Sequence, residues 1–167
     1  MQTVAPREKV VAADFPATAR AASVTPHGGT AGITIKELYQ SGILVIAHDR
    51  AYGKRVKTLL TQGGFTSIHS AHNGQTAVDL LHGSAAASMQ GIEAIVLHAP
   101  CHDTKSYALC RELLSKHQWA AIPVIVLSDN YQQQSDVMHA AYAAGATDVL
   151  FNPSADVELI ARLNSAL

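Results

Sequence analysis

Apolar residues follow a regular pattern from Gly42 onward, in which short β-branched runs alternate with segments of helical period. Runs that are apolar throughout are typical of strands buried on both faces of a parallel sheet. Strands that alternate with helices favour βαβ units, so the pattern predicts an α/β fold with a doubly wound five-stranded parallel sheet. The predicted strands are residues 43–47, 67–71, 92–97, 122–127 and 148–151.

Apolar residues at helical spacing follow each of the first four strands. Asn73-Gly74 marks the start of the second helix, and Gly145 takes the C′ position after the fourth. A fifth helix is expected after Pro153, with Ser154 as its N-cap. The four apolar stripes are Tyr52, Val56, Leu59 and Leu60; Ala77, Leu80 and Leu81; Tyr107, Cys110, Leu113 and Leu114; and Met138, Ala141 and Tyr142.

The first 41 residues differ in composition from the rest. Residues 1–32 contain Pro6, Pro16, Pro26 and the stretch HGGTAG, and such helix breakers and small residues bury little apolar surface by themselves. The next stretch, ITIKELYQSG, is compatible with one helical turn or with a short strand docked on the body. We therefore divide the chain into an N-terminal arm or linker, residues 1–41, and a main domain, residues 42–167.

Composition narrows the functional classes. With 167 residues, of which 48% are hydrophobic, the chain is long enough for one core and an appendage. The net charge of −1 and the scattered Lys and Arg argue against nucleic-acid binding. Cys101 and Cys110 form no C-x-x-C pair, and no segment has the length of a membrane span. We expect a cytoplasmic protein without membrane contact.

Seven stretches resemble, in order and spacing, the receiver domain of bacterial two-component response regulators. The resemblance covers about residues 43–167 and implies the flavodoxin-like receiver fold, with the sheet order 2-1-3-4-5. It also implies phosphoryl transfer from a histidine kinase to an aspartate, helped by Mg²⁺, a hydroxyl and a lysine. The stretches are ILVIAHD, GGF, AHNGQTAVDLL, IEAIVLH, CRELL, IPVIVLS and AGATDVLFNP.

Taken residue by residue, the resemblance places the family's reacting groups on side chains that lack the required chemistry. The two acids that hold Mg²⁺ fall on Ala47 and His48, and the phosphoacceptor aspartate falls on His98. The lysine falls on Asn152, and the hydroxyl alone is kept, as Ser128. Mg²⁺ prefers oxygen ligands, and phosphoryl transfer needs the charge of the metal and the lysine. We expect a degenerate phosphorylation site with no catalytic residue, no cofactor and no enzymatic activity.

A fold that is kept without its chemistry favours a module that acts by protein contact. The last helix has an apolar band wider than packing on one sheet face requires, and the competing interpretation is that the band packs against the N-terminal arm. The resemblance implies a dimer or partner face at the fourth helix, fifth strand and fifth helix of a receiver. We therefore predict a phosphorylation-independent signalling adaptor that binds a protein partner or a second copy. The predicted interaction face is Val149, Leu159, Leu163 and Leu167.

Two other hypotheses remain open. His48, His98, Cys101 and His102 are expected at the carboxyl edge of the sheet, where imidazole and thiolate would suit Zn²⁺ and histidines would respond to pH. Their spacing matches no strong zinc motif, so histidines that merely fill the pocket are the competing interpretation. The chain would then be a metal, ligand or pH sensor. The third hypothesis is a response regulator that is phosphorylated by unusual chemistry.

Overall fold

Five parallel strands form a single sheet in the order β2-β1-β3-β4-β5, which confirms the predicted fold and strand order. The computed structural model describes residues 35–84, 91–100, 104–129, 132–151 and 156–167. All five predicted strands are present, close to their expected bounds. They are β1 Gly42–Ile46, β2 Ile68–Ala71, β3 Ile92–His98, β4 Val124–Ser128 and β5 Asp148–Phe151.

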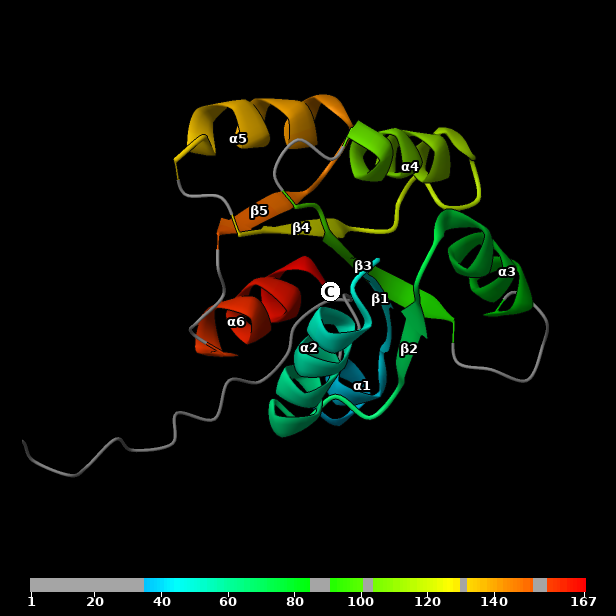
Figure 1. Cartoon of the computed structure of the whole chain (residues 1–167). Helices are drawn as coiled ribbons and strands as arrows, with labels where there is room; N and C mark the ends of the chain where they lie inside the picture. The colour runs from blue at the N-terminus through cyan, green and yellow to red at the C-terminus, as the bar shows by residue number, and fades with distance from the viewer. Residues whose placement is uncertain (1–34, 85–90, 101–103, 130–131, 152–155) are drawn as a thin grey trace, which may run out of the picture. The chain divides into compact units, whose positions relative to one another are not determined.

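Helices cover both faces of this sheet (Figure 1), with α2 and α6 on one face and α3, α4 and α5 on the other. Within the described ranges, no helix combines the length and the apolar character that a membrane crossing needs. The helices are α1 Ile35–Gln40, α2 Arg50–Gln62, α3 Gly74–Ser84, α4 Thr104–Ser115, α5 Gln134–Ala143 and α6 Asp156–Ala166.

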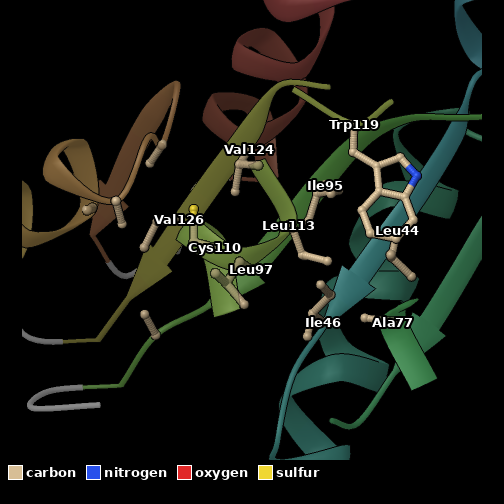
Figure 2. Close-up of a cluster of buried hydrophobic side chains, with 14 of the residues drawn as sticks. Leu44, Ile46, Ala77, Ile95, Leu97, Cys110, Leu113, Trp119, Val124 and Val126 are labelled. Carbon is tan, nitrogen blue, oxygen red and sulfur yellow. The ribbon is translucent and has the colours of Figure 1, made fainter. Parts of the chain in front are cut away.

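Two hydrophobic clusters fill the space between the sheet and its helices. Alternate residues of a strand point to opposite faces, so Ile43 and Val45 of β1 join the α2 and α6 side, whereas Leu44 joins the other. Figure 2 shows the second cluster, where side chains from β1, β3 and β4 meet the ring of Trp119 and Cys110 of α4. Burial raises the pKa of the Cys110 thiol to about 11, as expected for a cysteine that packs as a small apolar residue.

The short stretch before β1 forms a helix, α1, which settles the choice between helix and strand. The ring of Tyr39 packs edge-on against Phe65, with 5.6 Å between the ring centroids. The backbone N–H of Thr66 donates to the carbonyl of Tyr39 at 3.0 Å. Helix α1 belongs to the same compact unit as the sheet.

Helix α5 buries only one residue of its predicted stripe, Ala141, and buries Val137 in addition. Val137 and Ala141 are buried, whereas Met138 and Tyr142 are 39% and 45% exposed. Small and apolar residues lie on several sides of this helix, so its sequence leaves the rotation about the axis undecided. Gly145 ends the helix with φ +95° at the C′ position, as predicted.

The structure contradicts the predicted interaction face. Leu159 and Leu163 have no exposed surface, because α6 packs both side chains onto the sheet beside α2, and Val149 is buried under the opposite helices. Leu167 is partly buried against the α2 and α6 cluster. Val157 is the most exposed large apolar side chain of α6, with 77% of its surface accessible, and beside it Ala161 is exposed and Ile160 is half-buried. The apolar band of α6 is therefore mainly core.

Leu163→Arg tests this correction. A buried leucine costs roughly 2–5 kcal/mol of unfolding free energy when cut back to alanine, and a buried unpaired charge costs more. We expect Leu163→Arg to abolish cooperative unfolding in urea, followed by circular dichroism. Val157→Arg is the matched control on the same helix and should unfold like the parent protein. A folded Leu163→Arg variant would contradict the assignment of α6 to the core.

Candidate functional site

The carboxyl ends of β1, β3 and β4 bring four of the five predicted degenerate-site residues to one edge of the sheet. Ala47 and His48 directly follow β1, His98 is the last residue of β3, and Ser128 is the last residue of β4. Parallel neighbours all end at the same edge, and β3 pairs with both β1 and β4. Asn152, the fifth predicted residue, lies outside the described residues.

His98 is buried and tied to a carboxylate. The side chain is 7% exposed, and its Nε2 lies 3.1 Å from Oδ2 of Asp129, the residue after β4. A carboxylate oxygen only accepts hydrogen bonds, so the proton of this contact belongs to Nε2. The hydroxyl of Ser106 in α4 donates to the carbonyl of His98 at 3.2 Å. Both the ring and the backbone of His98 are therefore held in place.

Tyr52 of α2 covers the ring of His98. The two rings are stacked, with centroids 3.7 Å apart and planes inclined by 14°. Burial raises the pKa of Tyr52 to about 12, helped by the negative charge of Asp129 and opposed by the charge of Arg55. The tyrosine is therefore neutral at physiological pH and forms an uncharged wall of the site.

The residues that follow β1, 47–49, offer one carboxylate, that of Asp49. Ala47 is buried and contributes a methyl group, while its carbonyl lies 3.4 Å from Nδ1 of His72. His48 is exposed at the edge of the site. Asp49 is the N-cap of α2 and accepts from the backbone N–H of Ala51 at 2.7 Å. The acid that follows the expected metal positions in the sequence therefore stabilises a helix start.

These residues do not fit the Mg²⁺ ion that the receiver fold implies. A hard cation needs several oxygen ligands, whereas Ala47 has no donor atom and His98 directs a protonated nitrogen at Asp129. Asp129 is the acid beside the predicted acceptor position, and it is already engaged with that histidine. We therefore derive no step through a magnesium ion at this edge.

The predicted histidine and cysteine metal site is only partly within the described residues. Among the residues that the structure describes, no group of three or more His, Cys, Asp or Glu side chains is placed to hold a metal ion. Cys101 and His102 lie outside those ranges, so the full set with His48 and His98 stays a prediction.

Two residues of the site were missed by sequence reasoning. Asp129 was not among the predicted site residues, although it directly follows Ser128 at the carboxyl end of a buried strand. Its place beside His98 follows from the pairing of β3 with β4. Tyr52 was read as one position of an apolar helix stripe, and no signal in the sequence pointed its ring at His98.

Comparisons with known proteins agree with the sheet order and the helix arrangement described above. The family profile of the response regulator receiver domain matches residues 43–164. The KDP operon transcriptional regulatory protein KdpE of Escherichia coli K12 is 30% identical over 127 residues, which are 76% of this chain and 51% of KdpE. Response regulator MprA of Mycobacterium avium is 30% identical over 125 residues, 75% of this chain and 50% of MprA. The chain thus spans about half the length of these curated relatives.

Solved structures show the same fold. The signal receiver domain of a signal transduction histidine kinase from Syntrophus aciditrophicus is 25% identical with a TM-score of 0.58, covering 76% of this chain and 92% of that chain. The Vibrio cholerae chemotaxis protein CheY4 is 17% identical with a TM-score of 0.61, covering 77% of this chain and 99% of that chain.

Substitution of His98 tests its pairing with Asp129. His98→Asp places a buried carboxylate beside the exposed carboxylate of Asp129, so we expect a loss of roughly 2 kcal/mol of unfolding free energy at pH 7. His98→Asn is the matched control, because it loses the ring but adds no charge.

The difference in unfolding free energy between His98→Asp and His98→Asn should depend on pH. The folded Asp variant binds a proton more readily than the unfolded chain, so its stability rises relative to His98→Asn as the pH falls from about 7 to about 5. Urea unfolding at several pH values measures this difference. Equal stability of His98→Asp and the parent protein at pH 7 would contradict the assigned pairing.

Proposed function

Because the chain belongs to the response regulator receiver domain family, we propose that it is a signalling module that works without phosphorylation, by contact with a protein partner. Receiver domains act in two-component signal transduction, and this chain keeps the receiver fold. The single observation that carries the proposal is the acceptor position: His98 ends β3 there and is paired with Asp129. A module without an acceptor has protein contact as its means of passing a signal, and we propose no enzymatic step for it.

The chemistry of the edge supports this proposal. A phosphoryl group needs a nucleophile, a metal and a cation around its oxygens, and each such contribution in an enzyme site is worth about 3 kcal/mol. Here a histidine stands at the nucleophile position, and Ala47 and His48 stand at the metal positions. When several of these groups are absent, the reductions in rate multiply, and no useful rate of phosphoryl transfer is left.

Helix α5 offers the surface that best fits partner contact. Met138 and Tyr142 are exposed on one side of it, and a shallow hollow is lined by these residues together with His139. The helix flanks β5, an edge strand of the sheet. In receivers this region is the usual face for a partner or a second copy. We therefore place the contact surface on α5 and not on the buried leucines of α6.

The proposal concerns this module and not a longer protein. Its net charge of −1, with Lys and Arg scattered along the chain, supports a protein partner rather than a nucleic acid. A cysteine spacing without a C-x-x-C pair supports a reducing, cytoplasmic location.

Treatment with a phosphoryl donor tests the first half of the proposal. Incubation with Mg²⁺ and acetyl phosphate should give no phosphorylated protein in intact mass spectrometry. Mg²⁺ with beryllofluoride should leave the amide NMR spectrum unchanged. A receiver domain that keeps its acids and lysine serves as the positive control. A stoichiometric phosphoryl adduct on any residue would refute phosphorylation independence.

A substitution on α5 tests the second half. Tyr142→Arg places a charge in the exposed apolar patch without disturbing the core, so we expect weaker association and unchanged circular dichroism. Sedimentation velocity reports self-association, and pull-down with an identified signalling partner reports binding to another protein. Val157→Arg, on the opposite face of the sheet, should leave both unchanged. If Tyr142→Arg binds as the parent protein does, the α5 face is not the contact surface.

A further inference from the structure

Three cations lie in a row on the solvent-facing side of α2. Arg50, Lys54 and Lys57 follow one another at intervals of four and three residues, which brings them to one side of the helix, and all three are exposed. With a rise of about 1.5 Å per residue, this cation row extends for about 10 Å along the helix axis. Lys and Arg are spread along the chain as a whole, and the row is a local concentration of positive charge.

The cation row has no acidic counterpart in the described part of the chain. None of its three members forms an ion pair with a described residue. The helix itself, Arg50–Gln62, contains no Asp or Glu. Asp49 precedes the helix, but its carboxylate accepts from the backbone N–H of Ala51 at 2.7 Å as the N-cap. The charge of the row is therefore directed at solvent.

This arrangement of charges lowers the stability of α2. Like charges four residues apart repel each other on a helix, and a cation in the first turn opposes the helix dipole, which favours acids there. The other helices include the favourable pattern: Asp136 lies in the first turn of α5, and Glu158 of α6 pairs with Arg162 at 3.7 Å. A locally unfavourable pattern in an otherwise consistent fold is typical of a functional surface.

The rest of the chain restricts the partner to a short anionic segment. α2 has basic residues and no Asp or Glu, whereas the whole chain has a net charge of −1, so the residues outside α2 are together acidic. Nucleic acids and anionic membranes spread their charge well beyond the length of one helix, and these acidic residues would repel them. A short acidic segment of a protein meets the row without that repulsion.

The spacing of the row fits acidic side chains on a helix. Residues i, i+4 and i+7 of a partner helix lie on one side and repeat at the same rise per residue as the row. An extended segment repeats its same-side residues at about 6.7 Å and falls out of step by the third cation. A second copy of this chain does not supply such a helix, because no two acids within any described helix are three or four residues apart.

We propose that the cation row of α2 binds an acidic helix of a partner protein, with carboxylates at i, i+4 and i+7 opposite Arg50, Lys54 and Lys57. The row lies on the face of the sheet that α2 and α6 cover, whereas α5 covers the other face. The two contact surfaces are thus separate, and binding at the row does not depend on the α5 surface or on phosphorylation.

Two alanine-based peptides of about 15 residues, long enough to form a helix, test this surface. One has glutamate at i, i+4 and i+7, and the other has glutamine at the same positions. Titration of the full chain at low salt, followed by amide NMR, should give saturable shifts in α2 with the glutamate peptide, at the roughly millimolar Kd of a few exposed ion pairs. Raising the ionic strength to about 0.15 M should weaken this binding severalfold. The glutamine peptide should give no saturable shifts.

Charge variants separate binding from folding. Lys54→Glu replaces an attraction by a repulsion, so it should weaken binding of the glutamate peptide about tenfold. It also places an acid four residues after Arg50, which should raise the midpoint of thermal unfolding by about 1 °C. Lys54→Gln removes the charge alone and should weaken binding about threefold. Arg111→Glu makes the same reversal on the exposed side of α4 and should bind the peptide as the parent protein does.

Duplex DNA and vesicles containing phosphatidylserine are the competing polyanions. The proposal is refuted if either of them binds through the row more tightly than the glutamate peptide at the same ionic strength. It is also refuted if the glutamate peptide gives no saturable shifts, if the glutamine peptide binds equally well, or if Lys54→Glu and Lys54→Gln bind as the parent protein does. Binding that is lost in the Lys54 variants and kept in Arg111→Glu supports it.

Discussion

A parallel sheet with apolar strands must be covered on both faces, and this constraint determines most of the structure. β1 and β4 are buried along their whole length. Every helix beside the sheet therefore packs its apolar stripe into one of the two hydrophobic clusters. In α6 the residues that pack in this way are Leu159 and Leu163. Only side chains that point away from the sheet, such as Tyr142 and Val157, are left for contacts with other molecules.

The same constraint creates the functional edge. Parallel strands all end on one side, so the residues that follow β1, β3 and β4 meet there whatever their chemistry. In this chain they are a methyl group, an exposed imidazole, and a buried imidazole paired with Asp129 under the ring of Tyr52. A carboxylate at position 98 would face Asp129 with a like charge. The edge is thus stabilised by a histidine and an acid instead of a metal ion held between acids.

The proposed loss of phosphorylation concerns side chains at this edge, whereas the backbone around them has the receiver fold. Asp49 still starts α2, Asn73 still starts α3, and Gly145 still ends α5. These residues shape the backbone, so the sheet order does not depend on whether the edge can be phosphorylated.

The sequence by itself determined the five strands, their order through the family resemblance, most of the helix stripes and the side-chain chemistry available at Ala47, His48 and His98. Each of these follows from periodicity over a few residues or from the chemistry at single positions, which a linear pattern records. Tertiary structure alone decided the rotation of α5 and the burial of the α6 leucines, because an apolar band wider than one stripe can pack in several orientations. It also decided the partner of His98, since Asp129 lies 31 positions away and reaches the ring only through the pairing of neighbouring strands.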